Sequence, residues 1–230
     1  MPTDRTQDRT QDRKVVNMTQ FASSARFQPI KEVEAYWQAI RAGRLVPRRS
    51  EIDPRGIERA LEFAFVAERI ATGLGRLRIA GSHLTDLLGM EVRGMPLTAF
   101  FATNSRPVIT DTLEQVFADP AMAEITLTGE RGIGKPALDG RMILLPLKSD
   151  LGDISRVLGC LVTSGSVGRA PRRFEITDTR VTPLLGDARL PEPVTQDPAP
   201  RVPSGLAEAP ATFDPGPRPY LRVVRREDAE

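Results

Sequence analysis

The spacing of apolar positions predicts two amphipathic helices. Apolar residues recur three or four positions apart over residues 32–42 and again over residues 106–118. The two stripes comprise Val33, Tyr36, Trp37, Ile40, Ile109, Leu113, Val116 and Phe117. Two shorter helices are also predicted. Asp53 can cap the first of them and Pro54 can begin it, and Ser82 can cap the second.

Shorter apolar segments, several of them alternating, predict five strands. They cover residues 63–69, 76–80, 124–128, 141–147 and 156–163. In the second strand, Leu77 and Ile79 are expected on one face and Arg78 on the other. The order of helices and strands lacks the regular β-α alternation of a parallel sheet, so we expect an α+β fold with an antiparallel sheet flanked by helices.

Proline and polar composition divide the chain into three parts. Residues 1–17 contain a tandem Asp-Arg-Thr-Gln repeat with almost nothing to bury, and we expect them to be disordered. Eleven of the 20 prolines lie between Pro171 and Pro219. We therefore expect one domain over residues 18–165 and a long disordered C-terminal tail over residues 166–230. Within the tail, the apolar patch at 219–225 is either a short docking strand or an end that touches nothing.

The charge pattern argues against a polyanionic partner. The formal net charge is only +2, and the tail alone carries ten arginines interspersed with ten acidic residues. Arginine outnumbers lysine 28 to 4, which suits phosphate recognition but is also typical of a GC-rich coding sequence. Nucleic-acid binding is a third hypothesis, and the interspersed acidic residues argue against it. No run of residues is apolar enough to cross a membrane.

The only cysteine, Cys160, excludes an internal disulfide and multi-cysteine metal sites. It lies in an apolar strand, where we expect it to pack in the core. The N-terminus lacks the apolar core of a signal peptide, so we expect a cytoplasmic protein. The glycine-rich segment 129–136 has the wrong spacing for a phosphate-binding loop and is predicted to be a hairpin turn. We find no nucleophilic triad, and the chain is expected not to be an enzyme.

Several motifs in a fixed order resemble the small, single-domain PAS proteins common in alphaproteobacteria. They are the Trp37 helix, Leu45-Val46-Pro47-Arg48-Arg49-Ser50-Glu51-Ile52-Asp53-Pro54, Leu77-Arg78-Ile79-Ala80-Gly81-Ser82, Leu87-Leu88-Gly89-Met90-Glu91-Val92-Arg93-Gly94 and the strands at 142–147 and 158–163. The resemblance implies a five-stranded antiparallel sheet used for signal input or protein contacts. It also makes Tyr36 and Trp37 candidate interface residues, including in a homodimer; the simpler alternative is that their helix covers its own sheet.

A PAS-like pocket would lie between the sheet and the helix at 106–118. The candidate lining residues are Arg78, Phe101, Ile109, Leu127 and Leu144. Arg78 would either neutralise an anionic ligand or pair with a neighbouring carboxylate. Haem and flavin are not expected: His83, the only histidine, is not on the central helix, and Cys160 lacks the polar motif of a light sensor. We therefore expect no cofactor.

These features favour a non-enzymatic regulatory module. Because no kinase, cyclase or DNA-binding segment is recognisable, we expect the module to act through contacts with separate protein partners. The alternative is a sensor that binds a metabolite in the PAS-like pocket.

Overall fold

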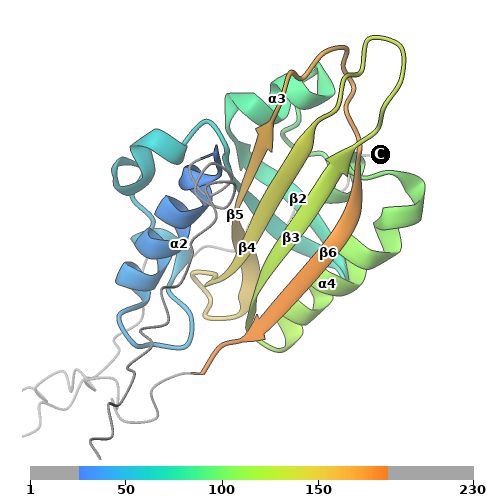
Figure 1. Cartoon of the computed structure of the whole chain (residues 1–230). Helices are drawn as coiled ribbons and strands as arrows, with labels where there is room; N and C mark the ends of the chain where they lie inside the picture. Colours follow the sequence, from blue (N-terminus) through green and yellow to red (C-terminus); the bar gives the residue numbers. More distant parts are fainter. Residues whose placement is uncertain (1–25, 186–230) are drawn as a thin grey trace, which may run out of the picture. The chain divides into compact units, whose positions relative to one another are not determined.

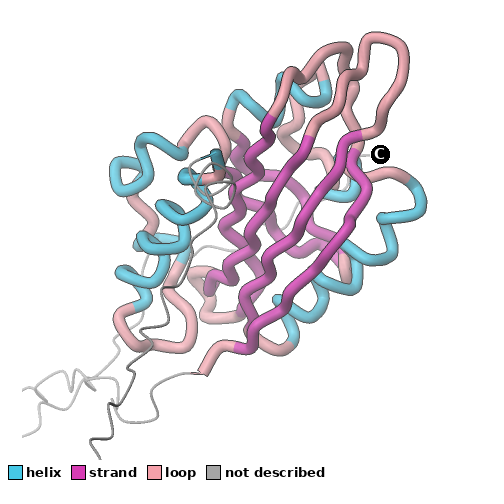
Figure 2. Tube along the Cα trace, in the orientation of Figure 1, coloured by secondary structure: helices cyan, strands magenta, loops and turns pink. Residues whose placement is uncertain are grey.

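A computed structural model describes residues 26–185, which fold around one antiparallel sheet (Figures 1 and 2). The helices, with η for 3-10 helices, are α2 (Gln28–Arg41), η1 (Arg49–Glu51), η2 (Pro54–Ala60), α3 (Ser82–Leu88), η3 (Leu97–Phe100), η4 (Thr103–Ser105) and α4 (Arg106–Ala118). The strands are β1 (Ala64–Ala71), β2 (Leu74–Ala80), β3 (Ala121–Gly129), β4 (Asp139–Lys148), β5 (Ile154–Ser164) and β6 (Phe174–Pro183). The predicted α+β class with an antiparallel sheet is confirmed, but the predicted number of five strands is wrong. The sheet has six strands, in the order β2-β1-β5-β4-β3-β6.

Both faces of the sheet are apolar, and each carries its own core. We call the face under α3, η3 and α4 the inner face, and the face that carries α2 and η2 the outer face; Figure 1 shows α2 and α4 on opposite sides of the sheet. Alternation along β5 sends Val157 and Leu161 into the inner core and Leu158 and Cys160 into the outer core. Such a sheet needs cover on both sides.

Trp37 fixes α2 to the outer face. Its side chain is 0% exposed, and its Nε1 donates a hydrogen bond of 3.0 Å to the main-chain oxygen of Pro146 in β4. Tyr36, on the same helix, is half-buried, and its hydroxyl accepts a hydrogen bond of 2.7 Å from the Asp53 amide. The proposed interface role of Trp37 is therefore wrong for the folded domain, because α2 covers its own sheet.

Strand β6 corrects the predicted domain boundary. Residues from 166 were expected to be disordered, yet Phe174–Pro183 pairs antiparallel with β3 along its whole length. A register shift at Thr177 interrupts the alternation, so that Phe174 and Ile176 contact the inner core before the shift and Val181 after it. Because of this shift, apolar residues do not alternate regularly along residues 174–183, and the alternation expected of a strand does not predict β6. The repeat at 1–17 and the patch at 219–225 lie outside the described residues.

A second bulge corrects the predicted faces of β2. Val66 pairs with Ile79, but its neighbour Ala67 pairs with Leu77, so Arg78 is the extra residue. Leu77 consequently enters the inner core, whereas Ile79 lies on the outer face beside Val66 and is 50% exposed. The prediction that Leu77 and Ile79 share a face is wrong.

Arg172, just before β6, joins two loop connections through three hydrogen bonds. It is 0% exposed, and its guanidinium donates hydrogen bonds to the main-chain oxygens of Val167, Glu130 and Pro136. These carbonyls belong to the β3–β4 and β5–β6 connections. A planar fork of donors suits such a site, because each buried carbonyl needs a partner.

We predict that Arg172→Lys lowers the free energy of unfolding by about 2–3 kcal/mol, because one ammonium group cannot replace the guanidinium at all three carbonyls. Arg173→Lys, at the exposed neighbouring position, is the matched control and should change stability little. Urea unfolding followed by Trp37 fluorescence measures both variants. Equal stabilities would contradict this role.

Candidate functional site

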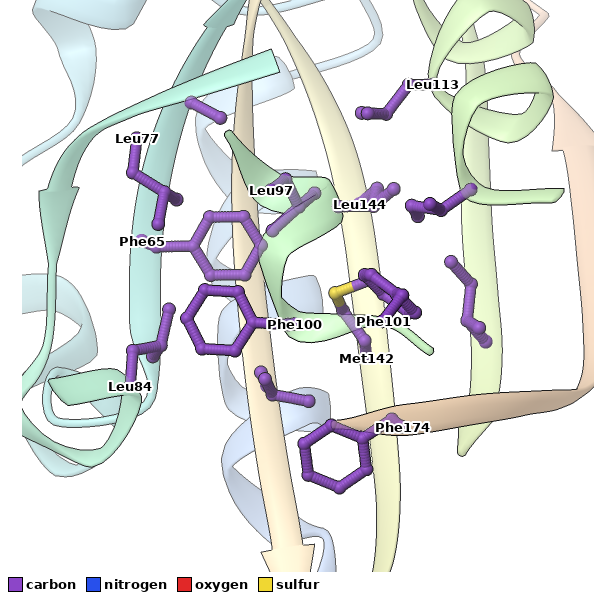
Figure 3. Packing of buried hydrophobic residues seen from close by; sticks show 14 of the residues in the cluster. Phe65, Leu77, Leu84, Leu97, Phe100, Phe101, Leu113, Met142, Leu144 and Phe174 are labelled. Atoms are coloured by element: carbon purple, nitrogen blue, oxygen red, sulfur yellow. The ribbon is translucent and has the colours of Figure 1, made fainter. Parts of the chain in front are cut away.

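Side chains fill the space between the sheet and α4, where the sequence predicts a pocket. Phe101, Ile109, Leu127 and Leu144 are each at most 1% exposed and belong to the inner core. The structure therefore brings these four candidates together, but as packed neighbours. Figure 3 shows Phe101 and Leu144 among the other side chains of this core.

Aromatic rings account for much of this filling. Phe65, Phe100 and Phe174 are buried in the same core and are labelled in Figure 3. The ring of Phe65 lies against Gly159, where an added Cβ would approach the ring to 2.1 Å. A glycine at this position of β5 thus leaves room for the ring, which closes the interior.

Arg78, the fifth pocket candidate, lies elsewhere. Its Nε donates to the carboxylate of Glu68, which also accepts a hydrogen bond of 3.3 Å from Arg156. Because Arg78 occupies the bulge of β2, its side chain joins this surface cluster and does not point at the inner core. Of the two roles considered for Arg78, the structure supports pairing with a carboxylate.

An apolar groove opens on the outer face, where α2 does not reach. It has a volume of about 620 Å³. Aliphatic side chains contribute most of its wall: Ile52, Pro54, Ile57, Leu61, Ala64, Val66, Ile79 and Leu158. Leu61 and Ile79 are 44% and 50% exposed. Arg49, Glu62 and Ser82 supply the polar groups of its lining.

The groove follows from the distribution of helices on the outer face. Helix α2 packs against β4, β5 and η2, so in the described part of the chain the apolar side chains at the β1–β2 end of the sheet lie beside η2 but are not covered by α2. The next strand position beside β2 is blocked in part, because Leu77 exchanges main-chain hydrogen bonds of 2.9 and 2.8 Å with Met95 and Gly94. A partner in the groove would therefore contact mainly apolar side chains, because the main-chain edge of β2 is partly occupied.

Sequence reasoning missed this groove. The alternation along residues 76–80 predicts Ile79 on the same face as Leu77, which lies in the inner core. Only the bulge at Arg78 turns Ile79 outward. The adjacent Pro54–Ala60 segment is a kinked 3-10 helix that buries Ile57 and Ala60 but leaves Leu61 exposed. No motif in the sequence marks either event.

His83 and Cys160 have structural surroundings. The His83 Nε2 lies 3.0 Å from the Thr163 hydroxyl oxygen, and its ring meets Phe63 edge-on with 5.0 Å between centroids. Burial lowers the pKa of His83 below its ordinary value, although Asp86 and Glu62 oppose this shift. Cys160 is fully buried in the outer core, and burial raises its pKa to about 12, so its thiol stays protonated.

The search for metal and membrane features covers residues 26–185. In this range no group of three or more His, Cys, Asp or Glu side chains is arranged to hold a metal ion. None of the helices described there combines the length and apolar character that a bilayer crossing requires.

The chain belongs to the PAS domain family. The family model matches residues 25–162, which is more than half of the 230 residues. No curated protein matches the chain.

Two solved structures resemble the fold at low identity. One is a tryptophan-to-alanine variant of the PAS-B domain of Drosophila melanogaster Cycle with bound glycerol, with 12% identity, a TM-score of 0.34, and coverage of 44% of this chain and 99% of that chain. The other is an RNA-binding light-oxygen-voltage receptor, with 19% identity, a TM-score of 0.35, and coverage of 51% of this chain and 35% of that chain.

We predict that His83 makes stability depend on pH. Because its pKa is lowered in the folded state, the unfolded chain binds the proton more readily, and stability falls as the pH drops below the ordinary value of 6.5. His83→Gln should lose less stability than the native protein between pH 7.5 and pH 5.5. Urea midpoints at the two pH values measure the difference, and identical losses would show that His83 does not contribute.

Proposed function

We propose that this PAS domain is a regulatory module that acts by binding a protein partner through the groove on its outer face. PAS domains commonly serve in sensing and signalling. The observation that carries the proposal is the contrast between the two faces: the inner core is closed by buried side chains, whereas the outer face exposes aliphatic side chains in a groove. Exposed, contiguous apolar surface commonly marks a site of interaction.

The shape and chemistry of the groove favour an amphipathic helix as its occupant. Main-chain pairing with an added strand is hindered at β2, because Leu77 already bonds to Gly94 and Met95. Side chains at helical spacing can instead insert between Leu61 and Ile79, while polar residues of the partner remain near Arg49 and Glu62. The partner we propose therefore presents a helix with one apolar stripe.

A metabolite in the inner pocket has less support from the geometry. Its candidate residues Phe101, Ile109, Leu127 and Leu144 contact one another in the core, so a ligand would first have to displace them. Opening such a packed core exposes apolar surface to water and leaves contacts unmade, which costs stability.

We predict that Ile79→Asp weakens partner binding at least tenfold, because it places a charge in the apolar groove without burying it in the folded domain. The partner is first identified by photo-crosslinking in the native host from a reactive residue at position 79. The affinity of the purified domain for the crosslinked segment of that partner is then measured by calorimetry.

Leu151→Asp is the matched control, since Leu151 is 95% exposed in the β4–β5 turn and lies outside the groove. It should bind as the native protein does. Circular dichroism and Trp37 fluorescence check that both variants fold. Equal binding by the two variants, or a crosslinked segment that cannot form an apolar stripe, would refute the groove as the docking site.

A further inference from the structure

Strand β6 leaves one side of the sheet open. It is the last strand of the sheet, opposite β2. The start of its free edge is occupied, because the Phe174 oxygen accepts a hydrogen bond from Ala102 and the Ile176 amide donates one to the Ser105 hydroxyl. Within residues 26–185, no strand pairs with the free side of β6, so residues 177–183 form an open edge.

The pairing with β3 determines which main-chain groups face outward. The Leu184 amide donates to the Pro120 oxygen, which makes these two residues a hydrogen-bonded pair. Hydrogen-bonded and non-hydrogen-bonded pairs alternate in an antiparallel ladder. Counting back along the register, Arg180 directs its main-chain groups toward β3, whereas Thr179 and Val181 direct theirs away from the sheet.

We propose that a second copy of this chain pairs with this edge, with the two β6 strands antiparallel about a twofold axis at Thr179. Thr179 then faces Thr179 of the second copy as a hydrogen-bonded pair. Asp178 faces Arg180 of the second copy, and Arg180 faces its Asp178. Both side chains are exposed in the single chain, so the interface gains two reciprocal ion pairs without burying a lone charge.

Charge selects this register over its neighbours. Moving the axis to Arg180 places the two arginines opposite each other, and moving it to Asp178 places the two aspartates opposite each other. Like charges directly opposite in a sheet are destabilising. The pairing between the two β6 strands is limited at both ends. At one end, Pro183 has no amide to donate. At the other end, Phe174 and Ile176 already bond to Ala102 and Ser105.

This interface is separate from the proposed groove. The groove lies at the β1–β2 end of the sheet and the open edge at β6, at the opposite end of the strand order. A dimer through β6 therefore leaves both grooves available, and failure of one proposal does not imply failure of the other.

Charge reversal tests the dimer. Sedimentation of the 230-residue chain should give a concentration-dependent rise from 25.3 kDa to twice that mass. Asp178→Arg and Arg180→Asp should each shift the equilibrium toward monomer at least tenfold, and the double variant should restore dimerisation because it rebuilds the reciprocal pairs. Asp150→Arg, an equal charge change in the exposed β4–β5 turn, should leave the dimer unchanged. A native monomer, or a double variant no better than the single ones, overturns the proposal.

Crosslinking tests the register itself. Thr179→Cys should form an intermolecular disulfide under mild oxidation, because the twofold axis places the two residues within disulfide reach of one another. Thr182→Cys is the control, since position 182 faces position 176 of the second copy. Cys160 is buried and should not interfere. Equal crosslinking at 179 and 182, or none at 179 in a dimeric sample, overturns the register.

Discussion

The organisation of this domain depends on the need to cover a sheet that is apolar on both faces. Strands β1, β4 and β5 alternate between two cores, so neither face can remain fully in water. Helices α3, η3 and α4 cover the inner face, and α2 with η2 covers the middle of the outer face. The apolar surface that α2 does not reach is the groove. Within residues 26–185, no strand pairs with the free side of β6.

The inner core is packed with side chains, so the functional contacts proposed for this domain lie at its surface. Phe65 occupies the space beside Gly159, and Phe100, Phe101 and Phe174 complete an inner core of low exposure. A PAS domain packed in this way has its accessible chemistry at the surface. Both proposals therefore concern surfaces: an amphipathic helix in the outer groove, and a second copy along β6. The first rests on apolar side chains and the second on main-chain groups with charge complementarity.

Two β-bulges, at Arg78 and Thr177, change which face of the sheet the following residues occupy. The bulge at Arg78 turns Ile79 out of the core and into the groove, and it also brings Arg78 to Glu68. Beyond the bulge at Thr177, Val181 lies on the inner face and β6 still pairs with β3. Because side chains alternate every residue in a strand, one extra residue exchanges the faces of everything beyond it.

The sequence by itself determined the local structure: the α2 and α4 stripes, the β1–β2 hairpin and the strands β3 to β5 all follow from apolar spacing and from capping or turn residues. The sequence also predicted correctly that Phe101, Ile109, Leu127 and Leu144 lie close together. Only the tertiary structure decided that these residues fill the interior, that Trp37 is covered and that residues 174–183 form a strand. Those outcomes depend on bulges and on which surfaces meet, and these contacts join residues far apart in the chain, so local spacing does not record them.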